Sequence, residues 1–164
     1  MPDKATKRRA VKDKRQGKAK STQAGEFVRE EIHHVREGKH GARSTKQAIA
    51  IGLSKARRSG VKLPPPKRGK AKTKQSARYA SRAAGRRARP SASRARGVRR
   101  ALRREGRTAA SRTALSRQAK GAARRRSAAE RTAAARRAVR TKGPRTRKAA
   151  ARKAARTRRR RAAA

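Results

Sequence analysis

The residues best suited to chemistry lie between positions 26 and 40, which hold the three histidines of the chain and four of its eight acidic residues. His33, His34 and His40 suggest a metal site, because histidine is the commonest metal ligand. On a helix, however, adjacent histidines point about 100° apart and chelate one ion poorly. A zinc site usually needs three or four converging ligands. We therefore predict no metal site and no cofactor.

The acidic residues do not form a catalytic pattern either. General acid–base catalysis needs a positioned group inside a pocket, whereas Glu26, Glu30, Glu31 and Glu37 read as solvated charge along one helix. Glu31 differs from the others, because it falls near the apolar stripe of that helix, where it can pair with a basic residue of the next helix. The sequence contains no phosphate-binding loop, nucleophile elbow or HExxH motif. We predict that the protein is not an enzyme.

The strongest chemical signal is positive charge. Lys and Arg number 56 against 8 Asp and Glu, a formal net charge of +48. Such a chain repels itself until a polyanion lies alongside, so the partner classes are DNA, RNA and anionic membranes. A membrane role lacks the Trp, Phe and Leu that anchor an interfacial helix. RNA recognition generally stacks aromatic side chains on bases, and the chain has one Phe, one Tyr and no Trp. DNA is the favoured partner, and RNA stays open because arginine also stacks on bases.

The candidate nucleic-acid contacts lie at the end of the predicted second helix and in clusters of basic residues further along the chain. They are Arg57, Arg58, Lys67, Arg68, Arg86, Arg87, Arg99, Arg100, Arg103, Arg104, Arg124, Arg125, Arg126, Arg136, Arg137, Arg158, Arg159, Arg160 and Arg161.

Composition divides the chain into three regions. Residues 1–20 have no periodicity and are predicted to be a flexible basic arm. Residues 21–66 have a net charge of only +5 and most of the large apolar residues, whereas residues 67–164 hold 38 Lys and Arg against two Glu. The prolines at 64–66 mark the boundary between them. So few large apolar residues cannot offset the entropy of ordering the whole chain. We predict a mostly disordered protein with a small all-α hairpin.

The hairpin consists of two helices, at about 22–37 and 45–59. The first stops at Gly38, a typical residue after a helix end, and its core face is formed by Phe27, Val28, Ile32 and Val35 with Ala24. Between the helices are about six residues, enough for an antiparallel pair. A DNA-reading helix-turn-helix is the less favoured alternative, because its turn is shorter and it needs a third helix.

The second helix opens with a capping box, Ser44-x-x-Gln47, and closes at Gly60 with Val61 placed to pack back on it. Its apolar stripe includes the core residues Ile49 and Leu53. Small residues at 48, 52 and 56 let another helix approach closely. Ile51 lies nearly opposite Leu53, and it is either a stray surface residue or part of a second apolar face that forms a homodimer.

The tail, residues 67–164, is of low complexity, with Ala and Arg tracts separated by Gly and Pro. Alanine and arginine favour helices, but like charges three and four residues apart oppose them. We expect the free tail to be disordered and to form short helices between the Gly and Pro breaks once phosphates neutralise its charge.

Residues 21–66 resemble an uncharacterised family of small basic bacterial proteins, a domain of unknown function, most clearly in the segment GKHGARSTKQAIAIGLSKARR. The tail resembles the Ala/Lys/Arg-rich tails of histone H1-like bacterial proteins, although it favours Arg over Lys about 30 to 8. The resemblance implies a bacterial, cytoplasmic protein and brings no activity, cofactor or site residue.

These observations favour a non-sequence-specific, histone-like protein that binds and compacts DNA in the nucleoid by neutralising its phosphate backbone. Two alternatives stay open. One is an RNA- or ribosome-associated basic protein. The other is an adaptor whose hairpin binds a protein partner while the tail tethers it to nucleic acid.

Overall fold

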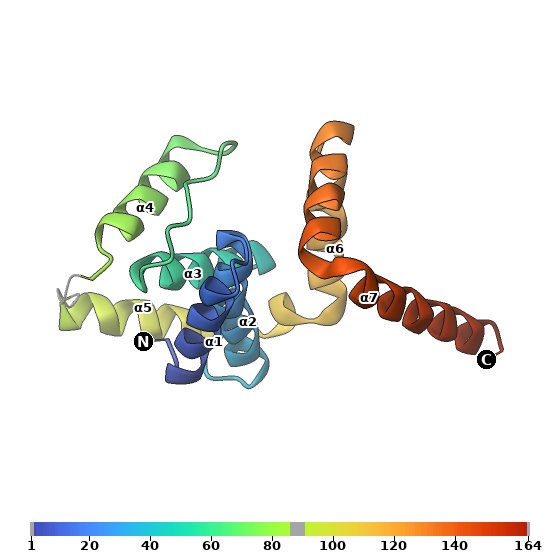
Figure 1. The fold of residues 1–164 in the computed structure, drawn as a ribbon. Coiled ribbons are helices and arrows are strands. Elements are labelled where there is room, and N and C mark those ends of the chain that lie inside the picture. The colour runs from blue at the N-terminus through green and yellow to red at the C-terminus, as the bar shows by residue number, and fades with distance from the viewer. Residues whose placement is uncertain (1, 86–90, 164) are drawn as a thin grey trace. The chain divides into compact units, whose positions relative to one another are not determined.

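The computed structural model describes residues 2–85 and 91–163. These residues form helices and no strand, and the chain is 76% helical. The helices follow one another along the chain as α1 (Lys4–Arg15), α2 (Lys20–Arg36), α3 (Thr45–Arg58), α4 (Ala71–Arg82), α5 (Ala92–Arg104), the 3-10 helix η1 (Thr108–Ala110), α6 (Arg112–Arg124) and α7 (Ala128–Ala162) (Figure 1). The chain divides into two compact units, residues 1–119 and residues 120–164.

The prediction of a mostly disordered chain is therefore wrong. The predicted tail contains α4 to α7, and residues 1–20, expected to be a flexible arm, contain α1. The high helix propensity of alanine and arginine and the local backbone hydrogen bonds outweigh the repulsion between neighbouring arginines. Arginine side chains also reach far enough to place their charged heads apart in water.

The two helices of the predicted hairpin are present as α2 and α3, with ends that lie within two residues of the predicted ones. Both predicted stops are confirmed: Gly38 and Gly60 have φ of 76° and 88°. Glycine is suited to this left-handed conformation because it has no Cβ. After α3, the Val61 N–H donates to the Ala56 carbonyl at 3.1 Å, which is the backbone hydrogen bond of a Schellman motif.

The capping box at the start of α3 is present in a modified form. Ser44 Oγ accepts a hydrogen bond from the Gln47 N–H at 3.2 Å. The Gln47 side chain accepts from the Arg43 N–H at 2.7 Å, one residue before the cap. The Ser and Gln therefore both satisfy backbone donors that the helix itself cannot reach.

Helices α2 and α3 pack closely because α3 presents small residues to its neighbour. Ala48, Gly52 and Ala56 are all buried. A Cβ atom at Gly52 would lie 2.6 Å from the Cα of Val28 in α2, so any side chain there would push the helices apart. The predicted close approach of a helix at positions 48, 52 and 56 is confirmed.

The core of residues 1–119 consists of two small clusters built largely from alanine. Ile32 and Val35 pack with Ala42, Ala48, Ala109 and Ala110, and Val28 lies at the edge of this cluster. Phe27 packs with Ala10, Ala24, Ala56 and Val61, with Leu53 beside it. Ile49, also predicted as a core residue, is half-buried and belongs to neither cluster. Short side chains let several helices share a core that the count of large apolar residues did not predict.

Ile51, on which the predicted homodimer depends, is half-buried in α3. Helix α4 packs on the same helix and buries Ala77 and Ala80. A further helix of this chain therefore already covers part of α3 beyond its contact with α2.

A short stretch of the predicted tail docks on the loop between α2 and α3. Backbone N–H groups of Gly41 and Ala42 donate to the carbonyls of Leu102 and Gly106 at 2.8 and 3.1 Å. Thr45 Oγ1 donates to the Ala109 carbonyl at 2.7 Å. A Cβ at Gly41 would overlap the Glu105 carbonyl, so glycine makes this close approach of the two backbones sterically feasible.

Residues 120–164 form a unit with a different construction. Ser127 and Glu130 make a complete capping box at the start of α7, with hydrogen bonds of 3.1 and 2.9 Å. Gly143, with φ of 58°, and Pro144 break α7 into two helical segments at a kink. The described part of this unit contains no buried residue. Among the described residues, no helix combines the length and the apolar composition needed to cross a membrane.

Candidate nucleic-acid interface

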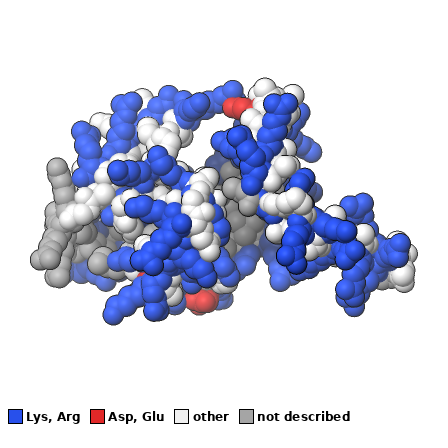
Figure 2. Space-filling model, viewed as in Figure 1, with Lys and Arg blue, Asp and Glu red and all other residues white. Residues whose placement is uncertain are grey.

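The predicted basic contacts lie on the surface, with one exception. The predicted contacts on α5, α6 and α7, and those directly after α6, are all exposed. Arg58, Lys67 and Arg68 are exposed as well. Arg86 and Arg87 lie outside the described residues. In the space-filling view, Lys and Arg cover most of the visible face, while Asp and Glu show at few points (Figure 2).

The exception is Arg57, which is 7% exposed. Its guanidinium donates hydrogen bonds to the carbonyls of Leu63 and Pro64 at 3.3 and 3.1 Å, and burial lowers its pKa. Arg57 therefore holds the segment after α3 against the helix rather than facing solvent. The sequence interpretation paired it with Arg58 as a phosphate contact because it could not tell which side of the helix end would be covered.

On α7, the second helical segment presents a continuous basic face. Its residues recur at helical spacing from 145 to 160 and line a shallow groove, with Ala149 and Thr157 among Arg145, Lys148, Arg152, Lys153, Arg156 and Arg160. At 1.5 Å per residue this face is roughly 22 Å long. A row of cations of that length can contact several successive phosphates of a duplex at once.

On α5, the arginines have a similar spacing. Arg96, Arg99, Arg100 and Arg103 recur at intervals of three and four residues, so they share one side of the helix. No residue of α5 is buried, and all four arginines are exposed. The helix is therefore a second linear array of cations, in the unit that contains residues 1–119.

Sequence reasoning missed a third basic feature, a cleft of about 800 Å³. The cleft lies where the N-termini of α3 and α6 meet, and exposed Arg43, Lys46 and Arg117 line it together with hydroxyl side chains. Ser111 caps α6 by accepting the Ala114 N–H at 3.2 Å. Helix N-termini carry partial positive charge and unpaired N–H groups, so this cleft suits a phosphate. The capping box at Ser44 was visible in the sequence, but the fold that brings α6 beside it was not.

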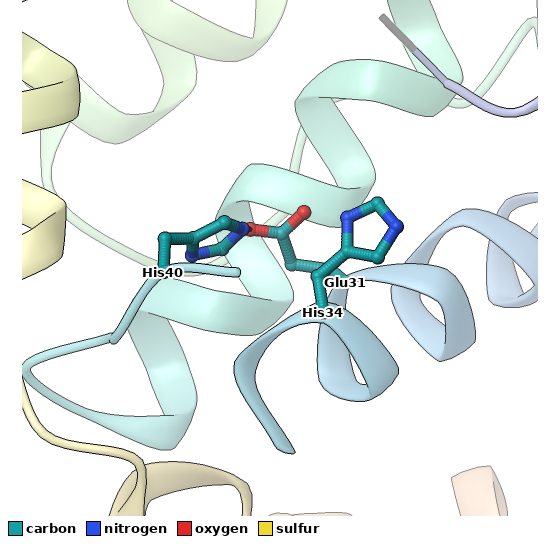
Figure 3. A group of neighbouring side chains, drawn as sticks. All are labelled: Glu31, His34 and His40. Carbon is teal, nitrogen blue, oxygen red and sulfur yellow. Dashed lines mark ion pairs between the residues drawn. The ribbon is translucent and has the colours of Figure 1, made fainter. Parts of the chain in front are cut away.

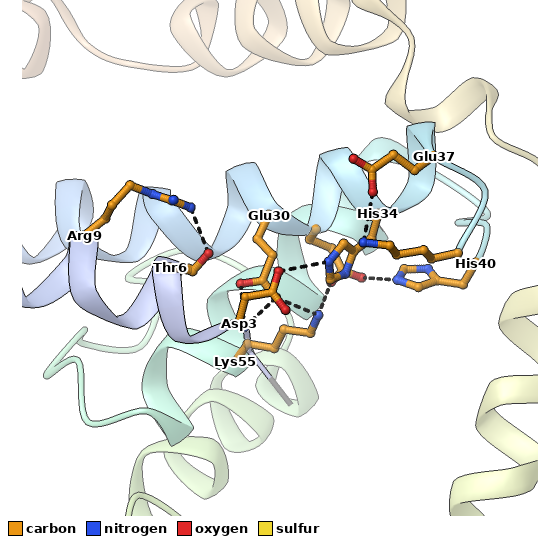
Figure 4. Close-up of polar contacts among 10 residues, drawn as sticks. Asp3, Thr6, Arg9, Glu30, His34, Glu37, His40 and Lys55 are labelled. Atoms are coloured by element: carbon orange, nitrogen blue, oxygen red, sulfur yellow. Dashed lines mark hydrogen bonds and ion pairs between the residues drawn. The ribbon is translucent and has the colours of Figure 1, made fainter.

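Two acidic residues of α2 are withdrawn from the surface. Glu31 is fully buried, and Glu30 is 5% exposed, so the expectation that Glu30 is solvated is wrong. The predicted pairing of Glu31 with a basic residue of the second helix is confirmed: Lys55 Nζ lies 2.6 Å from Glu31 Oε2. Arg9 of α1 also pairs with Glu26 of α2 at 2.6 Å. Figure 4 shows Lys55 beside the carboxylates of α2, and a hydrogen bond from Arg9 to Thr6 Oγ1 within α1.

The result of this pairing is a surface with an almost unopposed positive field. Glu30 and Glu31 are buried and Glu26 and Glu37 pair with nearby cations, whereas the arginines of α5 and α7 extend into solvent. Potentials of this kind attract polyanions without reading their sequence.

Residues 4–68 match the model of a family of unknown function (DUF6496). The match includes α1, which the resemblance seen in the sequence did not reach, and it ends before α4. No curated protein and no solved structure matches the chain. The comparisons therefore support an uncharacterised family over the three-helix part, α1 to α3, and leave the function to the physical chemistry of the surface.

Proposed function

We propose that the protein binds duplex DNA without sequence preference and compacts it in the manner of a histone-like, nucleoid-associated protein. Residues 4–68 would give the molecule its shape, and the basic helices would supply its affinity. Binding would come from neutralised phosphates and released counterions rather than from contacts to base edges.

The observation that carries this proposal is the arrangement of charge on helices. Basic side chains recur on one face of α5 and one face of α7 and are exposed there, while Asp13, Glu30 and Glu31 of the first unit are buried. Helical presentation spaces the cations along a line, as the phosphates of a duplex are spaced. Tyr79 is 63% exposed and is the sole tyrosine of the chain, so stacking on unpaired bases has little to rely on.

The test is the salt dependence of binding by the full-length protein to random-sequence and defined DNA duplexes. Contact with about ten phosphates gives a slope of log affinity against log salt near −9, so a fourfold rise in salt costs roughly five orders of magnitude. The two duplexes should bind alike, as measured by fluorescence anisotropy. Salt-insensitive binding, or strong discrimination between the duplexes, would contradict the proposal.

Direct competition between duplex DNA and a structured RNA distinguishes this proposal from its main alternative. Preference for the RNA would favour an RNA- or ribosome-associated protein. The adaptor alternative predicts that residues 1–119 retain a protein partner after the basic unit is removed. A homodimer through the hairpin stays a prediction, and sedimentation of the wild-type protein and its Ile51→Lys variant tests it.

Variants in the cleft between α3 and α6 allow a more specific test than truncation or competition. Replacing Lys46 and Arg117 together with alanine should reduce the magnitude of the salt slope by about two if both contact phosphate. The matched control replaces Lys7 and Arg8, two exposed cations of α1, and should have a smaller effect. Equal effects would mean that the cleft is not a preferred phosphate site.

A further inference from the structure

Three side chains that sequence reasoning kept apart converge at the end of α2. Glu31 and His34 lie on the same side of the helix, three residues apart. His40 belongs to the following loop, which turns back at Gly38, where the Lys39 N–H donates to the His34 carbonyl at 3.0 Å. One ligand atom from each of the three side chains lies within 4.8 Å of the other two. Figure 3 shows the two imidazole rings on either side of the Glu31 carboxylate.

The hydrogen bond of His40 decides which nitrogen of its ring can bind another group. His40 Nδ1 lies 3.0 Å from the Gly41 carbonyl oxygen. A carbonyl can only accept, so Nδ1 carries the hydrogen and a neutral ring keeps its lone pair on Nε2. That Nε2 lies 3.3 Å from Glu31 Oε1. Two electron-rich atoms face each other there, and a positive charge between them would turn the contact from repulsive to attractive.

The Glu31 carboxylate has lone pairs available for another partner. It is fully buried, and its neighbours are Lys55 Nζ at 2.6 Å and His40 Nε2 at 3.3 Å. Both contacts have the distance of an ion pair without the angle of a hydrogen bond, so within the described chain neither oxygen accepts one. A buried carboxylate without hydrogen bonds is costly unless another partner stabilises it.

Acidic residues beside the cluster also favour a bound cation. Glu30 and Asp3 lie beside His34, and one ligand atom from each of these three residues also lies within 4.8 Å of the others. Lys55 Nζ contacts Glu31 and lies 3.7 Å from Glu30 Oε1, so one ammonium group serves two buried carboxylates. Of the three side chains, His34 also lines a cleft of about 240 Å³ together with Asp3 and Glu30.

We propose that Glu31, His34 and His40 bind a divalent transition-metal ion, with Zn²⁺ as the representative. Zinc takes imidazole nitrogens and carboxylate oxygens at about 2.0–2.2 Å, so donor atoms around a tetrahedral ion lie about 3.3 Å apart. The His40 Nε2 to Glu31 Oε1 distance of 3.3 Å matches that spacing. His40 Nδ1 donates a hydrogen bond to a backbone carbonyl, and metal-binding histidines usually donate their other ring N–H in this way. Water completes the coordination.

The proposed ion would join the end of α2 to the loop that follows it. That loop also holds the predicted tail through the Gly41 and Ala42 N–H groups, next to His40. Metal binding therefore stabilises the loop, and with it the attachment of the segment that follows α5.

The test uses the full-length protein without a histidine tag, stripped of metal with a chelator and then dialysed. Titration with Zn²⁺ in a calorimeter should show saturable binding of one ion per chain. Thermal unfolding followed by circular dichroism should shift upward with Zn²⁺ and return when the chelator is added, because an ion that binds the folded state stabilises it. Co²⁺ in place of Zn²⁺ should give the visible absorption of a tetrahedral ion.

Three single variants assign the ligands. His34→Ala and His40→Ala should each weaken Zn²⁺ binding by more than the 10- to 100-fold that loss of an outer-shell partner costs. His33→Ala is the matched control, since His33 is the exposed neighbour of His34 on the same helix, and its affinity should equal that of the wild type. Circular dichroism without metal checks that each variant folds, and His40→Gln replaces any His40 variant that does not.

Absence of saturable Zn²⁺ binding to the wild-type protein would overturn the proposal, as would equal affinities of the His33, His34 and His40 variants.

Discussion

Residues 4–68 and residues 120–164 are both helical, but they reach that state by different physical routes. The first region buries apolar and charged residues against each other and brings helices so close that a Cβ at Gly52 would collide with the backbone of α2. In the described part of the second region no residue is buried, and a Cβ at Gly121 would find its nearest neighbour at 3.8 Å. One region depends on tertiary packing, and the other depends on the local stability of its helices.

This difference suggests a division of labour within one very basic chain. A packed region fixes where its side chains lie, so it can hold a cleft or a cluster of ligands. An unpacked basic helix gains most from a partner that screens its charge, since like charges along one helix destabilise it. The second region is thus the better source of affinity for a polyanion, and the first is the better place for a built site.

The largest expected effect comes from removing residues 120–164, which carry 19 of the 56 Lys and Arg residues. If about eight of these contact phosphate at once, their loss reduces the magnitude of the salt slope by about 7, or roughly four orders of magnitude in affinity over a fourfold salt range. Anisotropy titrations of DNA with the full chain and with residues 1–119 measure this. An unchanged slope would assign the affinity to the packed unit and reverse the comparison.

The next prediction contrasts two glycines inside helices. Gly52→Ala forces a Cβ to within 2.6 Å of the Val28 Cα, so it should destabilise the first unit by about 1–3 kcal/mol, the cost of overpacking a core. Gly97→Ala in α5 meets nothing within 4 Å and should stabilise that helix by up to about 1 kcal/mol, because alanine favours helices over glycine. Thermal unfolding of both variants checks the signs. Equal effects would mean that α5 is packed as tightly as α3.

The sequence predicted the packed region much better than the unpacked one. The helix stops at Gly38 and Gly60, the cap at Ser44 and the burial of Phe27 all follow from local signals that the fold keeps. Helix α1 and the helices beyond residue 67 were missed, because the count of large apolar residues measures the capacity for a core and says little about helices that lack such residues. There the balance between propensity and repulsion decides, and single residues do not reveal it.

The candidate sites divide in the same way. Exposure of the clustered arginines could be predicted, since nothing apolar surrounds them. The meeting of α3 with α6 and of His40 with Glu31 depends on how the chain turns back, which is a property of the assembled fold. The burial of Arg57 could not be predicted for the same reason, because neighbouring positions at a helix end have opposite environments.

Arg57 and Arg58 test this point directly. Arg57→Ala removes hydrogen bonds to two backbone carbonyls and should cost about 1–3 kcal/mol of stability while leaving the salt slope unchanged. Arg58→Ala replaces an exposed side chain, so its stability should change by less than about 0.5 kcal/mol, and its salt slope by one unit at most. Denaturant unfolding and DNA titration of both variants measure the two effects. A reduced slope for Arg57→Ala in a folded protein would show that this residue reaches phosphate.

The smallest expected effect concerns an exposed pair at the end of α2. The hydrogen bond from Lys39, followed by the charge of Lys39, lowers the pKa of Glu37, and the hydrogen bond to Glu37 raises the pKa of Lys39. Because the Glu37 pKa is lower in the folded state, the pair stabilises the protein above the ordinary value of 4.5, and this contribution is lost as the pH falls through the folded pKa. Because the Lys39 pKa is raised, its contribution is present below 10.5 and is lost as the pH rises through the folded value.

Glu37→Gln should therefore lower the unfolding temperature slightly at neutral pH and low salt, and the difference from the wild type should shrink steadily as the pH falls below 4.5. The effect is small because both side chains are exposed, and added salt should reduce it further. The double variant with Lys39→Ala should be no less stable than Glu37→Gln alone, since one interaction is lost in both. A difference that persists at low pH and high salt would mean that Glu37 acts through packing rather than charge.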